Sequence, residues 1–282
     1  MRLTSQQLRF FHTFGFLAFP GHFADESDAI SRAFEDVWAA HGGGHHGDTH
    51  DHQNRSALVP FVDEHPYLSS LIDDPRIDRP IATLLGDDYN YSGSDGNLYV
   101  GDTNWHSDGQ LKPRRLSIKI AFYLDPVASD TGCLRVIPGS QHAMDDFAQA
   151  VHAGAHDYYD AHTEGLWGIS GQDIPALALE TEPGDMLLFN HLTKHASFGG
   201  TKRRRMFTLN FEARCPDNEL DDLRESIAHL SRFWVTRAYG EIMIQTAGPE
   251  RMRHLEQRLT NDSHLAALTD QARAEMDEPS RA

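Results

Sequence analysis

The chain has few cysteines and no long apolar run. Its 282 residues include only two cysteines, Cys133 and Cys215. Two cysteines are too few for a disulfide framework or a thiolate zinc site, and they are typical of a reducing compartment. No stretch approaches the roughly 20 consecutive apolar residues that cross a bilayer, and the first 15 residues are too polar for a signal peptide. We therefore expect a cytoplasmic globular protein with no membrane partner.

Basic residues are also scarce. Lys and Arg number 25 against 42 Asp and Glu, which gives a formal net charge of −17. A chain of this charge is repelled by phosphate backbones and by anionic lipid surfaces. We expect no nucleic-acid partner, and any basic cluster stands out against the acidic background.

Histidine, in contrast, is abundant, with 18 in the chain. Five of them fall within residues 41–52, in the segment HGGGHHGDTHDH. Such a segment suggests a metal site, but its three consecutive glycines and its polar residues are typical of a loop without a fixed framework. We predict a solvated loop or the edge of a lid here.

The N-terminal third is predicted to be helical. Residues 4–12 begin with Thr4 and Gln7 at capping-box spacing, and Gly15 is placed to end that helix. Residues 25–40 carry an apolar stripe at helical spacing and run into three glycines. A third helix is expected over residues 74–85, before Gly86, and the chain after residue 216 is expected to be helical again.

From residue 89 onward the pattern changes to short strands. Residues 116–124 alternate between apolar side chains and others with a period of two, and residues 206–211 alternate in the same way. Turn sequences containing Gly, Pro and Asp separate these runs, which favours a sandwich or jelly roll. We predict one domain over residues 1–282, mostly β with flanking α, comprising a helical part at 1–88, a β core at 89–215 and a helical extension at 216–282.

One short motif carries metal chemistry. In Trp105-His106-Ser107-Asp108, His106 and Asp108 project from the same side of an extended strand. One further imidazole brought in by the fold would complete a set of two histidines and one carboxylate, the ligand pattern of non-heme Fe(II) oxygenases. His195 and the nearby His191 are candidates for that imidazole.

A basic run follows His195. Counting back along the alternating strand places Arg204 on the same face as Met206 and Thr208. A buried arginine needs a partner, and a planar guanidinium matches a carboxylate held through two hydrogen bonds. A dicarboxylate cosubstrate near the metal would supply that partner. Alternatively, Arg204 is one of several surface basic residues in a turn, and Arg203 or Arg205 takes the role.

These motifs together resemble the phytanoyl-CoA dioxygenase family of Fe(II)- and 2-oxoglutarate-dependent oxygenases. The resemblance covers roughly residues 1–212. It rests on five segments: residues 3–17, Trp105 to Asp108, Thr131 to His142, Pro183 to Ser197, and Arg204 to Phe211. His195 precedes Ala-Ser where the family usually has His-Gly-Ser, which favours His195 over His191 as the ligand.

The resemblance implies a double-stranded β-helix, that is, a jelly-roll, cupin-like core buttressed by N- and C-terminal helices. It implies Fe(II) held by His106, Asp108 and His195, with 2-oxoglutarate as cosubstrate and O2 as oxidant. The far carboxylate of 2-oxoglutarate would pair with Arg204. Further contacts to 2-oxoglutarate are expected from Ser197, Asn97 and Tyr99.

The reaction implied is hydroxylation of a small polar metabolite or natural-product intermediate, with release of succinate and CO2. The carboxylate of Asp108 argues against halogenation, for which the family uses a small residue there. Desaturation, epimerisation and ring formation stay open, as does a jelly-roll metalloenzyme or binding protein that does not use 2-oxoglutarate. Besides the iron centre, no separate acid or base is assigned.

The substrate is predicted from a basic cluster and from aromatic residues. Lys112, Arg114 and Arg115 follow the metal motif. The favoured interpretation is a solvated basic loop, and the alternative is that they attract an anionic group of the substrate. Residues 145–171 read as an irregular excursion or lid. Expected substrate contacts are Trp105, Lys112, Arg115, Trp167, His191 and Phe207. The protein is expected to be a monomer or a homodimer.

Overall fold

A computed structural model describes residues 2–108, 115–142 and 168–281. The chain divides into two compact units, each described here by itself. The first unit comprises residues 1–2, 26–98 and 207–282, and the second comprises residues 3–25 and 99–206. The expected lid at residues 145–171 lies mostly outside the described residues, and the single-domain organisation stays a prediction.

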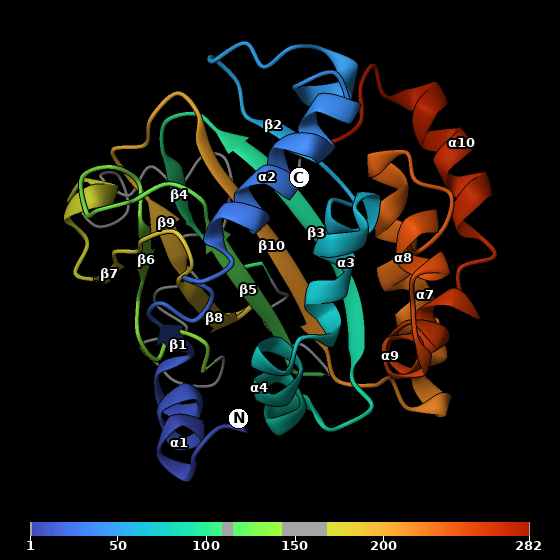
Figure 1. Cartoon of the computed structure of the whole chain (residues 1–282), viewed down its shortest axis with the longest axis horizontal. Coiled ribbons are helices and arrows are strands. Elements are labelled where there is room, and N and C mark those ends of the chain that lie inside the picture. Colours follow the sequence, from blue (N-terminus) through green and yellow to red (C-terminus); the bar gives the residue numbers. More distant parts are fainter. Residues whose placement is uncertain (1, 109–114, 143–167, 282) are drawn as a thin grey trace. The chain divides into compact units, whose positions relative to one another are not determined.

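The second unit opens with helix α1 (Ser5–Phe14), which packs against strand β1 (Phe16–Phe19) (Figure 1). The Thr4 hydroxyl accepts the backbone N–H of Gln7, and the Gln7 side chain accepts the N–H of Thr4. This capping box stabilises the helix start by about 1 kcal/mol. The helix ends at Gly15, whose φ of +85° is unfavourable for other residues. The expected helix is confirmed.

Two antiparallel sheets follow within the second unit. Strand β8 (Met186–Asn190) lies between β1 and β5 (Ser117–Tyr123). The other sheet has the order β4 (Thr103–His106), β9 (His195–Ser197), β6 (Leu134–Val136), β7 (Leu177–Leu179). Buried side chains from β1, β5, β6, β7 and β8 form one apolar cluster, which includes the free thiol of Cys133. Short strands were expected in this part of the chain and are present, and the jelly-roll connectivity stays a prediction.

The first unit holds most of the helices. Its N-terminal helices are α2 (Ser27–Ala40), α3 (Pro66–Ser70) and α4 (Pro75–Leu85). Its strands are β2 (Ser56–Leu58), β3 (Asn90–Tyr99) and β10 (Arg204–Glu212), of which β3 and β10 continue into the second unit. The expected helices at residues 25–40 and 74–85 are confirmed to within two residues at each end.

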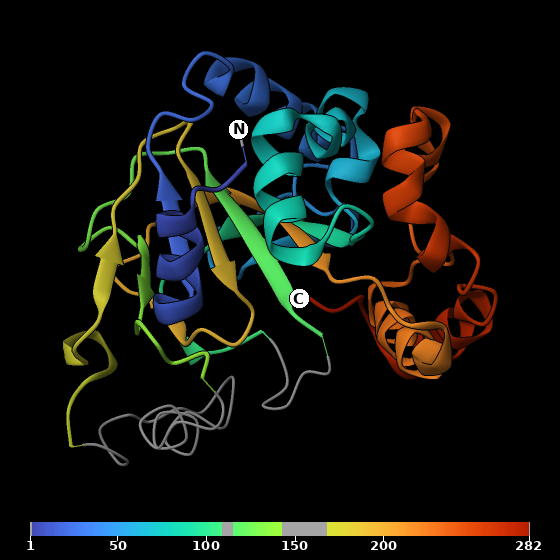
Figure 2. The same cartoon turned by 90° about the horizontal axis from the view of Figure 1, so that it is seen from below.

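The C-terminal region of the first unit is helical, as expected. It contains α7 (Leu220–Ala228), α8 (Glu241–Gln245), α9 (Pro249–Leu259) and α10 (Leu265–Glu275). Helix α7 contacts both α9 and α10, and Figure 2 shows these helices, coloured orange to red, as one group. No helix among the described residues is long and apolar enough to cross a bilayer.

The histidine-rich segment corrects one expectation. His45 and His50 are buried, so the prediction of a solvated segment is wrong for them. The ring nitrogens of His45 lie 2.9 Å from the carbonyl oxygens of Ala57 and Pro279, and Nδ1 of His50 lies 2.8 Å from the Ser56 hydroxyl. The His45 ring thus contacts two backbone carbonyl groups that would otherwise need hydrogen bonds from water.

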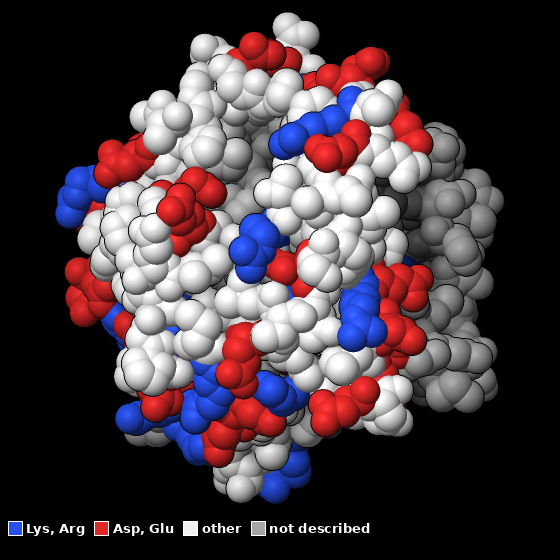
Figure 3. Space-filling model, turned by 90° about the vertical axis from the view of Figure 1, so that its right-hand side faces the viewer, with Lys and Arg blue, Asp and Glu red and all other residues white. Residues whose placement is uncertain are grey.

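Acidic and basic side chains are interspersed on the face drawn in Figure 3. Among the described residues seen there, Lys and Arg lie beside Asp and Glu. A continuous basic surface is what a phosphate backbone requires, and this face does not present one.

Candidate metal centre

Strands β4 and β9 bring two imidazoles together. Their antiparallel register pairs His106 directly with His195. The two rings lie 4.1 Å apart between centroids. Asp108 follows His106 by two residues, so its side chain returns to the same side of the chain. The local order of this strand pair therefore gathers all three side chains.

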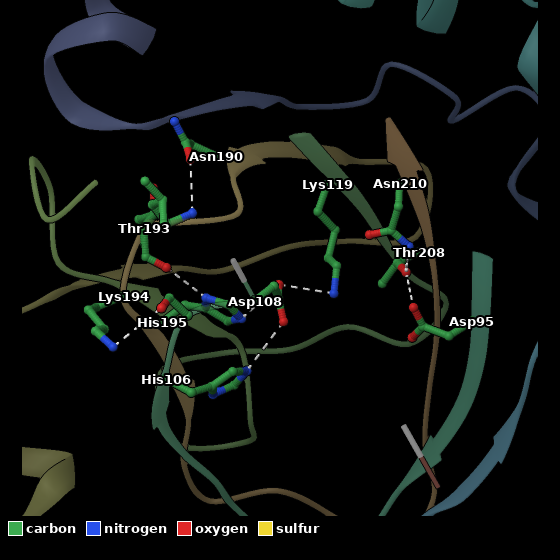
Figure 4. A network of polar contacts seen from close by, with 12 residues as sticks. Asp95, His106, Asp108, Lys119, Asn190, Thr193, Lys194, His195, Thr208 and Asn210 are labelled. Atoms are coloured by element: carbon green, nitrogen blue, oxygen red, sulfur yellow. Dashed lines mark hydrogen bonds and ion pairs between the residues drawn. The ribbon is translucent and has the colours of Figure 1, made fainter. Parts of the chain in front are cut away.

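The carboxylate of Asp108 faces the Nε2 atoms of both rings (Figure 4). Its Oδ1 is 3.8 Å from Nε2 of His106, and its Oδ2 is 3.5 Å from Nε2 of His195. The three ligand atoms fall within 4.8 Å of one another. The backbone N–H of Asp108 donates to the carbonyl of His191 at 2.8 Å, which anchors the turn after β4.

Both imidazoles are held in the orientation that metal binding needs. Nδ1 of His106 lies 2.7 Å from the carbonyl oxygen of Asn104, and Nδ1 of His195 lies 2.9 Å from that of Thr193. A carbonyl oxygen only accepts, so Nδ1 carries the proton in each ring. The lone pairs of both Nε2 atoms then face Asp108, which is the tautomer of a metal-ligating histidine.

The charges also suit a divalent cation. Burial lowers the pKa of His106 to about 3, assisted by the neighbouring His195, and burial lowers the pKa of His195 as well. Burial alone would raise the pKa of Asp108, but the Lys119 ammonium and the two imidazoles outweigh it and hold this pKa below its ordinary value. At neutral pH the site offers two neutral imidazoles and one ionised carboxylate.

Lys119 is a member of this site that the sequence did not predict. Its Nζ lies 3.0 Å from Oδ2 of Asp108, and both side chains are 16 % exposed. In the sequence, Lys119 stood among the residues alternating with the apolar side chains of strand β5. A lysine in the middle of a core strand, on the same face as Ala121 and Tyr123, is unusual because lysine is rarely buried without a partner. That position could have identified Lys119 from the sequence.

Arg204 is buried at the start of β10, with 2 % of its surface exposed. Its Nε and Nη1 have no hydrogen-bond partner among the described residues, and its guanidinium lies 5.1 Å from the centre of the Tyr99 ring. Arg203 is exposed, and Arg205 forms an ion pair with Asp125 at 2.5 Å. Of the three arginines, Arg204 alone combines burial with unpartnered N–H groups in the described part of the chain.

Two glycines provide the space for Arg204. A Cβ on Gly132 would lie 1.9 Å from its Nη1, and a Cβ on Gly200 would lie 2.7 Å from the same atom. The Ser197 hydroxyl donates to the carbonyl of Gly132 at 2.7 Å. This contact occupies the hydroxyl proton, so donation from Ser197 to 2-oxoglutarate would require the hydroxyl to rotate away from Gly132. That donation stays a prediction.

The sequence profile of the family described as phytanoyl-CoA dioxygenase (PhyH) matches residues 11–206. The chain belongs to this dioxygenase family. No curated protein matches it. The match spans β4, β9 and the start of β10, so the strands that carry the candidate metal centre and Arg204 lie within the matched residues.

Solved structures share the fold at low identity. One is SnoK, a non-heme α-ketoglutarate-dependent carbocyclase from nogalamycin biosynthesis, with a TM-score of 0.58, 20 % identity and coverage of 75 % of this chain and 84 % of SnoK. EctD from S. alaskensis, solved with 2-oxoglutarate and 5-hydroxyectoine, has a TM-score of 0.54 and 22 % identity, with coverage of 75 % of this chain and 76 % of EctD. HygX from Streptomyces hygroscopicus, solved with nickel and 2-oxoglutarate, has a TM-score of 0.55 and 16 % identity, with coverage of 76 % of this chain and 88 % of HygX.

The remaining expected residues of this dioxygenase lie in varied surroundings. Trp105 is buried on the strand face opposite His106, packs against Phe198, and donates its indole N–H to the carbonyl of Gly171 at 2.8 Å. That position does not favour substrate contact. His191 lies beside the metal centre, since its carbonyl accepts the Asp108 N–H.

Two expected residues belong to the first unit. The Asn97 side chain accepts from Arg55 at 2.9 Å and donates to Asp95 at 2.5 Å. Phe207 is fully buried and packs against the ring of Phe61. Their roles toward 2-oxoglutarate and substrate stay predictions. Lys112 and Trp167 lie outside the described residues, whereas Arg115 is described and half-buried.

Proposed function

We propose that this chain is an Fe(II)- and 2-oxoglutarate-dependent oxygenase that hydroxylates a small molecule, with succinate and CO2 as coproducts. The observation that carries the proposal is the trio of His106, Asp108 and His195, held as two neutral imidazoles and an ionised carboxylate. Family membership and the shared fold with 2-oxoglutarate oxygenases support it.

The three side chains would hold Fe(II) on one side and leave its other positions open. When bound, the iron activates O2 for oxidation of a C–H bond, coupled to decarboxylation of 2-oxoglutarate. The donor set fits this metal, because imidazole nitrogen and carboxylate oxygen suit iron and no thiolate is present in the trio. The carbonyls of Asn104 and Thr193 keep both rings oriented toward the metal.

Arg204 would bind the far carboxylate of 2-oxoglutarate. Its unpartnered Nε and Nη1 need an acceptor, since a buried guanidinium without one is costly. A carboxylate accepts two such N–H groups at once, and burial strengthens the pair by excluding water. Ser197, Asn97 and Tyr99 are the further proposed contacts. We infer an intracellular enzyme, a monomer or homodimer, acting on an anionic metabolite that Lys112 and Arg115 attract.

A second candidate is ring formation or epimerisation with the same cofactors. SnoK is described as a carbocyclase and SnoN, which also shares the fold, as an epimerase. Both outcomes begin with the same C–H oxidation, so the metal centre alone does not separate them. The mass of the product decides: hydroxylation adds one oxygen atom, ring formation removes two hydrogens, and epimerisation leaves the mass unchanged.

The proposal is tested by reconstituting the protein with Fe(II) under argon and adding 2-oxoglutarate. We expect a metal-to-ligand charge-transfer band and, after admission of air, succinate formation that depends on both components and rises with one of a panel of small anionic metabolites. The matched pair is Arg204→Met and Arg203→Met, of which only the first should weaken 2-oxoglutarate binding, by about 10- to 100-fold. A wild-type protein that binds Fe(II) but yields neither band nor succinate would favour the jelly-roll metalloenzyme or binding protein without 2-oxoglutarate.

A further inference from the structure

Among the described residues, one hydrogen bond holds the backbone of Asp108. It lies two residues beyond the end of β4, and its N–H donates to the carbonyl of His191. A carboxylate on so short an anchor can rotate about its side-chain bonds. Its orientation therefore depends on what its two oxygens contact.

Lys119 provides that contact from a strand in the middle of its sheet. Strand β5 pairs with β8, and the register sets Lys119 opposite Phe189. The Phe189 ring in turn packs against His195, with 4.9 Å between ring centroids. The lysine and one metal-ligating histidine are thus both positioned by the same pair of strands, and Lys119 reaches Asp108 from a rigid element.

The contact is made to one carboxylate oxygen. Nζ of Lys119 lies 3.0 Å from Oδ2 of Asp108, which is also 3.5 Å from Nε2 of His195 (Figure 4). Oδ1 faces Nε2 of His106 at 3.8 Å. A charge-assisted hydrogen bond on Oδ2 draws electron density from that oxygen and fixes its direction, so it competes with the second bond that a bidentate carboxylate would make to a metal. The number of oxygens that Asp108 gives also sets how many positions are left for other ligands.

We propose that Lys119 is a positioning residue that holds Asp108 as a one-oxygen ligand of the metal. A bidentate Asp108 would occupy one of the positions that 2-oxoglutarate and O2 need. With Oδ2 bound to Lys119, the trio gives three protein atoms and the remaining positions stay open. This inference rests on the proposed function, because it concerns the metal that the trio would hold.

The test compares Lys119→Met with wild type and with Lys194→Met. Met removes the ammonium at nearly constant length. Lys194 is the matched control, because its buried side chain also lies near His195. Its ammonium donates to the Ser107 hydroxyl at 3.4 Å and forms no ion pair with a carboxylate among the described residues. Lys119→Arg restores a cation with N–H donors. Lys119→Gln also removes the ammonium and has a shorter side chain than lysine.

Each protein is loaded with Co(II), and its visible spectrum is recorded without 2-oxoglutarate. We expect Lys119→Met and Lys119→Gln to show the weaker bands of a higher coordination number, and Lys119→Arg and Lys194→Met to match wild type. The affinity for 2-oxoglutarate, measured by calorimetry on Mn(II)-loaded protein, should fall about 10- to 100-fold in Lys119→Met and less than threefold in Lys194→Met.

A Co(II) spectrum of Lys119→Met identical to wild type overturns the inference, even if 2-oxoglutarate affinity falls, because the loss is then an effect of charge alone. A wild-type protein that binds Co(II) but not 2-oxoglutarate refutes the proposed function instead. The spectra still decide the role of Lys119 in that case, so the two failures are distinguishable.

Discussion

Filling the space beside Arg204 tests the cosubstrate site without touching a charged group. In Gly132→Ala, the new Cβ would lie 1.9 Å from Nη1 of Arg204 and 3.0 Å from Cα of Gly200. The backbone of Gly200 blocks one side, so the guanidinium must move. The φ of +95° at Gly132 adds strain for alanine, at about 1–2 kcal/mol. We expect 2-oxoglutarate affinity to fall about 10- to 100-fold, the value of one charge-assisted hydrogen bond.

The matched control is Gly139→Ala. Gly139 has a similar φ of +84°, but the nearest atom to its Cβ would be the Thr13 carbonyl oxygen at 3.7 Å. The control therefore carries the backbone strain without the collision. Both variants should lose stability in urea unfolding, Gly132→Ala by more because of the collision. Only Gly132→Ala should lose affinity for 2-oxoglutarate on Mn(II)-loaded protein by calorimetry. Wild-type affinity in Gly132→Ala would refute the assignment of Arg204, and equal losses in both variants would attribute the effect to strain.

Three further predictions concern the metal, pH and the buried ion pair of the first unit. Asp108→Ala should weaken Mn(II) binding by more than the about 10- to 100-fold typical of a residue outside the ligand set, with abolished succinate formation; retained binding in calorimetry would remove Asp108 from the set. Burial raises the pKa of Asp63 to about 6, although the Gly240 N–H and Tyr91 hydroxyl oppose it. Between about pH 4 and 6 the folded state keeps a proton that the unfolded chain has released, so stability should fall with rising pH by about 1.4 kcal/mol per unit. Asp63→Asn should lack this decrease in the free energy of unfolding. If urea unfolding gives the same stability difference between Asp63→Asn and wild type at every pH in this range, the prediction is contradicted. Arg258→Met leaves Glu212, its partner at 3.0 Å, charged and only 10 % exposed, and should cost about 3–5 kcal/mol. The exposed pair of Arg224 and Asp221 is the control, with Arg224→Met expected to cost under about 1 kcal/mol; equal losses in the two variants would argue against burial as the cause.

Much of the fold followed from local patterns. The capping box of Thr4 and Gln7, the stop at Gly15 and the strand within residues 116–124 are short-range signals, and the structure contains each of them. Strand β2 was missed, since its three residues are too few for a period to emerge. The burial of His45 and His50 was missed for a different reason: their partners include Pro279, more than 200 residues away, and no local pattern carries that contact.

The candidate site was predictable where strand alternation applies. Alternation placed His106 with Asp108 and selected Arg204 between two other arginines. The burial of Arg204, and the lack of a hydrogen-bond partner for its Nε and Nη1 in the described part of the chain, support that choice. Lys119 was not assigned, because its partner Asp108 is brought to it by the fold and not by spacing. The orientation of both imidazoles by backbone carbonyls was equally invisible, since such contacts do not depend on side-chain identity.

The pairing of β4 with β9 has a consequence for how the protein opens. Strand β9 has three residues, and its register with β4 shifts between the two paired positions, Thr103 with Ser197 and His106 with His195. The hydrogen bonds of so short and irregular a strand pair contribute little stability by themselves, so β4 and β9 can separate locally. A cation shared by His106, Asp108 and His195 would bind only the closed arrangement and so stabilise it in proportion to the logarithm of metal concentration. The availability of iron would then determine how long the β4–β9 pairing stays closed, as well as whether the site can react.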